Sequence, residues 1–378
     1  MLDIKLLFEK FKNMGINFYT GVPDSQLKAL CDHVTNEYGI GNKHIIAANE
    51  GGSVGLAAGH YLATGSPAVV YMQNSGIGNA INPICSLINE KVYRIPMLFV
   101  IGWRGQPGVK DEPQHIFQGE ITLKLLDCLN IPYFIIKKDT TEKEIDSALE
   151  KASDALSQKK PFALVVQKGS LEICDKANYC NDHPLTREKI VQIIIDGMSE
   201  SDIVVSTTGK LSRELFEARE ARGESHKRDF LTVGSMGHSS MIAMGIAMEK
   251  PDRRIYCLDG DGAALMHMGS MAVLASQKSK NLIHFIVNNS AHETVGGMPT
   301  VSNNIDYPTL AKSVGYSHAF AATNEVELKA VISKLDGLSG PIFVEVKANL
   351  ESRADLGRPT TTPTQNKDDF MSFIKEAF

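Results

Sequence analysis

The sequence lacks features that several classes of protein need. Basic residues are not in excess, with 39 Lys and Arg against 44 Asp and Glu and a net charge of −5, which argues against a nucleic-acid-binding protein. The longest apolar runs, such as PMLFVIGW from Pro96, fall far short of the ~20 residues of a membrane helix. Charged residues close to Met1 break any signal-peptide pattern. We therefore expect a cytoplasmic protein with neither a nucleic acid nor a membrane as its partner.

Cysteines are few and scattered. The six are Cys31, Cys85, Cys128, Cys174, Cys180 and Cys257. None forms a C-x-x-C pair, so no zinc or redox motif is predicted. Scattered cysteines in a chain of 378 residues are typical of a reducing compartment. We expect each one to be a small buried hydrophobic side chain.

A complete nicotinamide-binding fingerprint is also missing. In SGIGNAI, Gly76 and Gly78 lack the third glycine of G-x-G-x-x-G, and GDGAAL from Gly260 has no glycine at the right spacing. A nicotinamide-dependent dehydrogenase remains a rival class because glycine-rich strand–helix turns are present. A requirement for NAD would favour that rival.

Short apolar runs alternate with helical patterns along the whole chain. The runs in the first half are NFYTG, HIIAA, PAVVYM, PMLFVIG, PYFII and PFALVVQ, and those in the second are DIVVST, DFLTVG, RRIYCLDG, LIHFIVNN, SHAFAA and PIFVEV. Alternating strands and helices predict an α/β protein with two doubly wound, parallel-sheet domains. The polar segment GSLEICDKANYCNDHPLTRE separates the two sets. We expect domains at residues 1–175 and 188–378, with a linker at 176–187.

A pattern for binding a cation and a phosphate follows two neighbouring strands. Gly260, Asp261 and Gly262 come directly after one strand, and Asn289 ends the next strand along the chain. Carboxyl ends of parallel strands meet at one edge of a sheet, so we expect Asp261 and Asn289 to lie close together. Their oxygens suit Mg²⁺, and a helix starting near Ala263 would offer free N–H groups to a phosphate. The alternative is two turns that contain these residues by chance.

An acidic residue stands at a strand end in the first half. Glu50 follows the strand HIIAA and opens a helix of small residues. It would lie on the edge of the sheet where ligands bind. The alternative is plain capping, in which an acid at a helix N-terminus stabilises the helix by up to about 1 kcal/mol.

These motifs resemble those of the thiamine-diphosphate-dependent enzymes. The whole chain is similar to the two-domain decarboxylases of that group, the phosphonopyruvate and sulfopyruvate decarboxylases, which have a pyrimidine-binding and a diphosphate-binding domain and no central domain. The matching segments are GVPDS from Gly21, NEGGSVGLAAGHYLATG from Asn49, WRGQPGVKDEPQH from Trp103 and SRADLGRPTTTP from Ser352.

The resemblance implies a bound thiamine diphosphate and Mg²⁺. Asp261, Asn289 and the carbonyl of Ala291 would be the metal ligands. Glu50 would contact the ring nitrogen N1′ of the aminopyrimidine and start catalysis. The other cofactor-binding residues implied are Thr208, Gly209, Gly234, Met236, Gly260, Gly262 and Ala263. Met236 could equally be an ordinary core residue.

The resemblance further implies a small anionic 2-oxo acid as substrate. We expect 3-phosphonopyruvate, converted to phosphonoacetaldehyde and CO₂ in phosphonate biosynthesis; sulfopyruvate decarboxylation, decarboxylation of another 2-oxo acid, acetolactate-type ligation and non-catalytic cofactor binding are the alternatives. The expected substrate-binding residues are Asp24, Ser25, Arg104, Lys110, His115, Arg353 and Arg358. The four cations could equally be solvated loop charges.

One position of this chain differs from the pattern of related pyruvate decarboxylases. It is the position of the residue expected to protonate the reaction intermediate that remains after CO₂ is lost. Those enzymes have a Glu six residues after the metal-binding Asn, where this chain has Val295. We therefore assign proton donation to Asp24 and His115. The resemblance also implies at least a homodimer, with the sites at the subunit interface.

Overall fold

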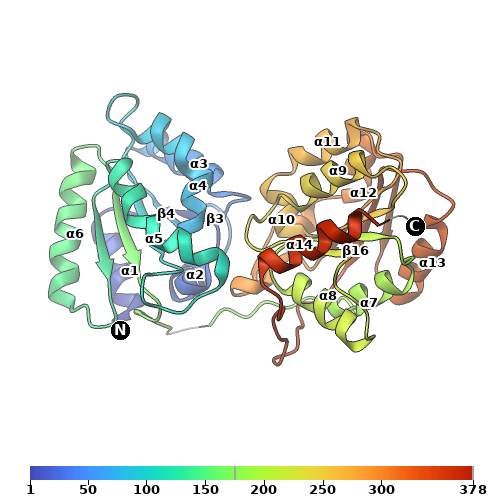
Figure 1. Ribbon diagram of the computed structural model, residues 1–378. Helices are drawn as coiled ribbons and strands as arrows, with labels where there is room; N and C mark the ends of the chain where they lie inside the picture. The colour runs from blue at the N-terminus through green and yellow to red at the C-terminus, as the bar shows by residue number, and fades with distance from the viewer. Residues whose placement is uncertain (174–175, 377–378) are drawn as a thin grey trace. The chain divides into compact units, whose positions relative to one another are not determined.

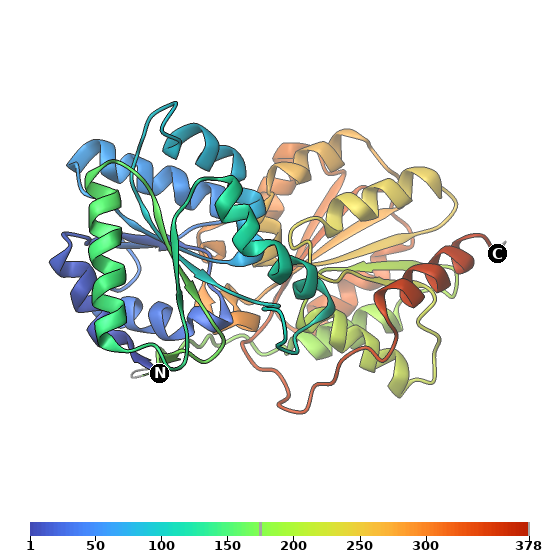
Figure 2. The same ribbon diagram turned by 60° about the vertical axis from the view of Figure 1, so that its left-hand side comes forward.

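The chain folds as two compact units, Met1–Asn178 and Tyr179–Phe378. The computed structural model describes residues 1–173 and 176–376. Figures 1 and 2 show, in each unit, a layer of strands with helices on both sides. Cys174 and the expected domain end at residue 175 lie outside the described residues, and the linker at 176–187 stays a prediction.

The first unit is built on a parallel sheet of six strands in the order β3-β2-β4-β5-β7-β6. The strands are β2 (Tyr19–Gly21), β3 (His44–Ile46), β4 (Val69–Gln73), β5 (Leu98–Gly102), β6 (Tyr133–Ile136) and β7 (Phe162–Val166). The helices are α1 (Ile4–Asn13), α2 (Lys28–Tyr38), α3 (Glu50–Thr64), α4 (Ile77–Pro83), α5 (Pro113–Cys128) and α6 (Glu142–Ser157).

Both faces of this sheet are buried. Val70 and Met72 of β4 pack with Phe99 of β5 in a cluster that includes residues of α3, α4 and α5. Tyr71 and Val100, which alternate with them along the strands, are equally buried on the other face. A strand covered on both sides is apolar along its whole length, which is the pattern that the sequence shows.

The second unit repeats this architecture with the order β10-β9-β11-β12-β16-β15. The strands are β9 (Ile203–Ser206), β10 (Asp229–Leu231), β11 (Ile255–Gly260), β12 (Leu282–Asn288), β15 (His318–Ala322) and β16 (Ile342–Lys347). The helices are α7 (Arg187–Asp196), α8 (Lys210–Ala221), α9 (Ser239–Glu249), α10 (Asp261–Met266), α11 (Gly269–Ser276), α12 (Tyr307–Val314), α13 (Glu325–Leu335) and α14 (Pro363–Ile374).

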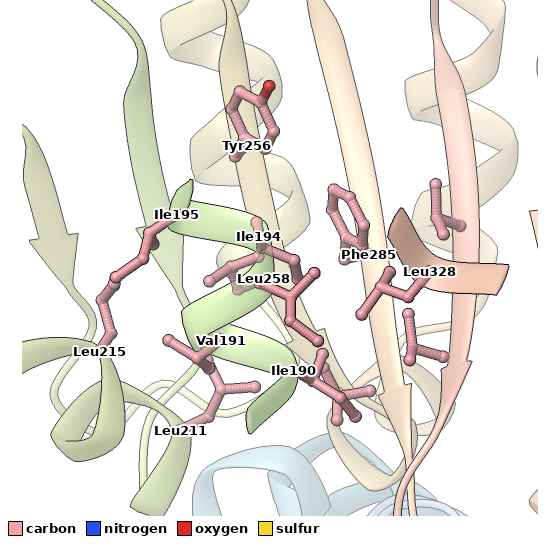
Figure 3. Packing of buried hydrophobic residues seen from close by; sticks show 14 of the residues in the cluster. Ile190, Val191, Ile194, Ile195, Leu211, Leu215, Tyr256, Leu258, Phe285 and Leu328 are labelled. Carbon is pink, nitrogen blue, oxygen red and sulfur yellow. The ribbon is translucent and has the colours of Figure 1, made fainter. Parts of the chain in front are cut away.

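One face of the second sheet packs against α7, α8 and α13. Figure 3 shows Ile190 and Ile194 of α7 lying over Leu258 of β11, with Phe285 of β12 beside Leu328 of α13. Fully burying one such side chain contributes about 1.5–3 kcal/mol. Residues of α9, α11, α12 and α14 cover the opposite face in a second cluster. The sheet is therefore a rigid platform whose strand ends are held in place from both sides.

The two sheets have the same strand order when the strands are numbered along each unit, which confirms the expected pair of doubly wound domains. In each sheet the second strand along the chain lies on one side of the first strand, at the edge of the sheet. The third strand lies on the other side of the first, so the chain crosses from one side to the other. The crossing lies between β2 and β4 in the first unit and between β9 and β11 in the second. Ligands of open α/β sheets bind beyond the strand ends at such a point.

Some features differ from the expectation. Strands β1 (Leu2–Asp3) and β8 (Leu171–Glu172) pair with each other, as do β13 (Ala291–His292) and β14 (Met298–Pro299). None of the four was predicted, because two-residue strands are too short to show a pattern. The single helix expected from about Ala263 begins at Asp261 and is broken into α10 and α11.

The expectation that every cysteine is buried was wrong for Cys85, Cys128 and Cys180, which are exposed. Cys128 is the last residue of α5, and Cys180 lies in the irregular segment before α7, so neither is covered by a neighbouring layer. Cys31 and Cys257 are buried as expected. None of the described helices is long and apolar enough to cross a membrane.

Candidate active site

Asp261 occupies the start of α10, directly beyond the end of β11. Its side chain is buried, and its Oδ2 accepts a 2.6 Å hydrogen bond from Thr300 Oγ1. Burial raises the pKa of Asp261 to about 6, although the hydrogen bonds from Thr300 and Ser302 oppose the shift. A carboxylate held in this way is stabilised by a cation placed beside it.

Asn289 and Ala291 lie on the turn that follows β12. The Ala291 N–H donates to Asn289 Oδ1 at 3.1 Å. Ala291 pairs with Pro299, which has no N–H, and Thr300 N donates instead to Ser290 O at 2.8 Å. The Ala291 carbonyl therefore points away from β14. Thr300 donates hydrogen bonds both to Ser290 of this turn and to Asp261, so the turn and Asp261 lie at neighbouring strand ends. Carboxylate, amide and carbonyl oxygens are of the kind that a divalent cation prefers.

The loops after β9 and β10 lie at the same edge of the second sheet, and a hydrogen bond joins them. Gly234 N donates to Thr208 Oγ1 at 3.1 Å. Gly209 has φ of 106°, and a Cβ there would lie 3.3 Å from Thr294 Oγ1, so a larger residue would be strained and crowded. A Cβ on Gly262 would lie 3.5 Å from Met236 Cε.

The remaining expected cofactor residues belong to the same place in the second unit. Gly260 precedes the first turn of α10 and Ala263, which is buried, lies within it. The structure thus brings together all the cofactor-binding residues that the sequence predicted in this unit: Thr208, Gly209, Gly234, Met236, Gly260, Asp261, Gly262, Ala263 and Asn289. The free N–H groups in the first turn of α10 are of the kind that bind a diphosphate group.

An ion-pair network lies behind the Asn289 turn and was missed from the sequence. Glu293 Oε1 is 2.9 Å from Lys210 Nζ, and its Oε2 is 3.0 Å from Asn289 Nδ2. Arg187 also donates to Glu293 and holds Glu214 through two 2.6 Å hydrogen bonds. No sequence motif signals this cluster, because its members come from three separate segments, α7, α8 and the turn after β12.

Glu50 is the first residue of α3, after the N-cap Asn49. Asn79 Nδ2 donates to Glu50 Oε2 at 2.8 Å, and Gly76 lies so close that a Cβ there would clash with the carboxyl group. Burial raises the pKa of Glu50, while the hydrogen bond from Asn79 acts in the opposite direction. The residue is more than a helix cap, since it is 5% exposed and has no cationic partner among the described residues.

Asp24 and Arg104 lie at two further strand ends of the first unit. Asp24 is fully buried, accepts a 2.6 Å hydrogen bond from Gln73 Nε2 and caps the 3₁₀ turn η1 (Ser25–Leu27). Burial raises the pKa of Asp24, and the nearby Arg104 opposes the shift. Arg104 binds Asp111 through Nε at 2.8 Å and through Nη2, which leaves Nη1 directed at Ser25 Oγ, 3.3 Å away.

A cavity of about 360 Å³ opens beside Ser25 and Arg104. Its wall includes two more cations, Lys28 and Lys168, that the sequence analysis did not select. Lys28 also pairs with the buried Asp32 at 2.6 Å. A cavity with three cations in its lining suits an anionic ligand.

His115 is buried in the first turn of α5, and its Nδ1 finds no partner within the described part of the chain. Burial and the nearby Arg104 lower the pKa of His115 to about 4, so the ring is neutral at pH 7. Lys110 is exposed on the loop before α5. His115 and Lys110 follow the end of β5, but within the part of the chain that the structure describes no hydrogen bond joins His115 to Asp24.

Arg353 and Arg358 lie in the second unit, on the segment after β16. Arg353 is 41% exposed and already bound to carboxylates, with Glu188 at 2.9 Å, Asp355 at 3.1 Å and Glu217 also in contact. Arg358 is exposed. A ligand that recruits Arg353 has to compete with these acidic partners.

Comparisons with known proteins match both units. The N-terminal thiamine pyrophosphate-binding domain of thiamine pyrophosphate enzymes matches residues 4–126, and the C-terminal thiamine pyrophosphate-binding domain matches residues 208–346. A phosphonopyruvate decarboxylase of Streptomyces viridochromogenes is 30% identical over 96% of this chain and 92% of its own length. One from Streptomyces hygroscopicus is 30% identical over 100% and 95%. Sulfopyruvate decarboxylase subunit beta of Methanococcus maripaludis is 30% identical over 51% of this chain and 99% of its own length.

The buried Glu50 carboxyl predicts a pH-dependent gain in stability for Glu50→Gln. Because folding raises the pKa of this carboxyl, its protonated form favours the fold at low pH, and that contribution is lost as pH rises through the folded pKa. Glutamine does not titrate and keeps an oxygen for Asn79. We expect the ligand-free variant to melt a few °C above the parent at pH 7.5, since each kcal/mol shifts Tm by about 2–4 °C in a domain of 150–250 residues. The difference should shrink toward pH 4.5, and a variant that melts lower at pH 7.5 would contradict this account.

Proposed function

Because this chain belongs to the thiamine pyrophosphate enzyme family, we propose that it decarboxylates 3-phosphonopyruvate to phosphonoacetaldehyde and CO₂. The observation that carries the proposal is the match to two phosphonopyruvate decarboxylases over nearly the whole of both chains. The cation-lined cavity beside Arg104 supports an anionic substrate. Sulfopyruvate is the second candidate, because a sulfopyruvate decarboxylase subunit matches half of the chain.

We infer that Mg²⁺ and the cofactor diphosphate bind at the strand ends of the second unit. Asp261, Asn289 and the Ala291 carbonyl would hold the metal, and the turn at Thr208 and Gly209 would hold the diphosphate. Thiamine diphosphate supplies the electron sink that a 2-oxo acid needs in order to lose CO₂. Met236, whose Cε lies near Gly262, would support the cofactor rings, and the Gly234 carbonyl would accept from the aminopyrimidine amino group.

We propose that Glu50 exchanges a proton with ring nitrogen N1′ of the aminopyrimidine. Its burial and raised pKa support this role, because a carboxyl group whose pKa is raised toward the working pH is a better general acid–base catalyst. A protein that only bound the cofactor would gain little from a buried acid that costs stability. Catalysis is therefore the better account of Glu50.

We assign the phosphonate to the Arg104 side of the cavity, where Ser25, Lys28 and Lys168 also lie. Lys110, Arg353 and Arg358 remain candidates for the same anion. Asp24, whose pKa is raised by burial, is one candidate for proton donation. His115 is neutral at pH 7 and would donate only from an imidazole N–H.

We further propose a cytoplasmic enzyme of phosphonate biosynthesis that is at least a homodimer. In that assembly the first unit of one subunit and the second unit of its partner would bind one cofactor. The two half-sites, one with Glu50 and one with Asp261, would then complete each other.

Glu50→Gln should lower kcat by at least ~10²-fold, because removing a general acid–base group usually costs that much. Thiamine diphosphate should still bind, since the diphosphate contacts are untouched. Steady-state assays with saturating cofactor measure the first effect, and calorimetry measures the second. Turnover close to that of the parent would rule out the assigned role.

Asp261→Ala removes the one charged metal ligand that we propose. Affinity for thiamine diphosphate should fall by at least about 10-fold, and excess Mg²⁺ should restore part of it, because metal affinity depends on the ligand set. Calorimetric titration at several Mg²⁺ concentrations is the measurement. Asp336→Ala, which removes a carboxylate whose side chain is 83% exposed, is the matched control and should bind as the parent does. Equal cofactor affinity in both variants would show that Asp261 is not a ligand.

The phosphonate assignment predicts a strong substrate preference. Cations built to pair with a phosphonate are left unpaired when pyruvate binds, and each ~1.4 kcal/mol is worth tenfold in kcat/KM. We expect kcat/KM for phosphonopyruvate to exceed that for pyruvate by at least ~10²-fold, with sulfopyruvate between them. Arg104→Ala should reduce the phosphonopyruvate value selectively, with pyruvate turnover as the internal control. A panel in which sulfopyruvate is the best substrate would favour the second candidate.

A further inference from the structure

We propose that Glu293 is a positioning residue that holds the Asn289 side chain in the orientation needed to bind the metal ion. The inference rests on the proposed function, because it assumes that Asn289 is a Mg²⁺ ligand. Glu293 follows the Asn289 turn, in the short 3₁₀ turn η4 (Glu293–Val295). Glu293 contacts the proposed ligand Asn289, and we do not place it among the metal ligands themselves.

The hydrogen bonds of Asn289 fix which way its amide faces. Nδ2 donates to Glu293 Oε2 at 3.0 Å, and Oδ1 accepts from Ala291 N at 3.1 Å. Rotating the amide by 180° would set its oxygen against the carboxylate and its NH₂ against an N–H. The oxygen is therefore held on the side of the Ala291 N–H. Without Glu293, the only remaining orienting bond that the structure gives the side chain is the one from Ala291.

Glu293 is itself held in place from two other segments. Arg187, 8% exposed, contacts Oε2, and Lys210 Nζ lies 2.9 Å from Oε1. Arg187 is fixed in turn by its two bonds to Glu214, whose side chain is 2% exposed. With both oxygens occupied by cations in a largely buried place, the carboxylate has little freedom to turn away from Asn289.

The Glu293 carboxylate also connects the Asn289 turn to two other segments of the proposed site. Lys210 directly follows Gly209 and also donates to Ser352 Oγ at 2.7 Å. Ser352 precedes Arg353 on the segment after β16. A displacement of Glu293 would therefore affect both the turn at Thr208 and Gly209 and the segment after β16.

The test compares Mg²⁺ binding by Glu293→Met with that of Glu214→Met. Methionine has about the length of glutamate but no oxygen that could accept from Asn289. Both changes remove one carboxylate from Arg187, but only the first removes a partner of Asn289. Outer-shell changes at metal sites typically cost about 10–100-fold in metal affinity. We expect Glu293→Met to weaken Mg²⁺ binding by that factor in calorimetric titrations with thiamine diphosphate present, and Glu214→Met to weaken it by less than about 3-fold while lowering Tm. Comparable losses in the two variants, or no loss in Glu293→Met, would overturn the proposal.

Two further variants keep the outcome decisive. Glu293→Asp keeps the charge but withdraws it from Asn289, so it should also weaken Mg²⁺ binding and serves if the Met variant does not fold. In an Asn289→Ala background, Glu293→Met should have no further effect on Mg²⁺ binding, because the two residues act as one unit. Additive losses would contradict the proposal. If the parent protein binds neither Mg²⁺ nor thiamine diphosphate, the proposed function fails first, and that result is distinct from a difference between variants.

Discussion

The parallel pairing of strands is the constraint on which the rest of the molecule depends. In a parallel sheet all carboxyl ends lie at one edge, so residues that are far apart in sequence but follow strands become neighbours. In the second unit this brings the ends of β9, β10, β11 and β12 together around Asp261. In the first unit it does the same for the segments that carry Asp24, Glu50 and Arg104. Each edge is rigid because helices pack on both faces of its sheet.

Buried acidic side chains at the carboxyl-end edge of each sheet lower the free energy of unfolding of the ligand-free protein. Asp24, Glu50 and Asp261 are each nearly inaccessible to water, and burial raises the pKa of all three. Such groups weaken the ligand-free fold and are tolerated only because the cores beneath them bury many large side chains. Glu293 is a contrasting case, since Arg187 and Lys210 neutralise it directly. Among the described residues, Asp24, Glu50 and Asp261 thus differ from Glu293, which forms ion pairs with two cations.

The sequence predicted the strands well because strands buried on both faces are apolar throughout, and all twelve predicted runs contain a strand. The strand-end residues Asp261 and Asn289 could be found because strand–helix–strand spacing sets their positions. Glu293, Lys28 and Lys168 could not, because each reaches its place through a tertiary contact that leaves no local pattern. The pairing of Arg104 with Asp111 was missed for the same reason, although the two residues share one loop. The three exposed cysteines could not be predicted, because amino-acid composition does not indicate which side of a helix or loop faces water.

The pairing of strands within each sheet has a consequence for where the chain can be divided. Within the described residues, every pairing between strands joins strands of the same unit, and none crosses from residues before 179 to those after. Neither sheet needs the covalent connection at the end of the first unit in order to be complete. A chain divided near residue 178 would therefore keep every strand pairing that the structure describes.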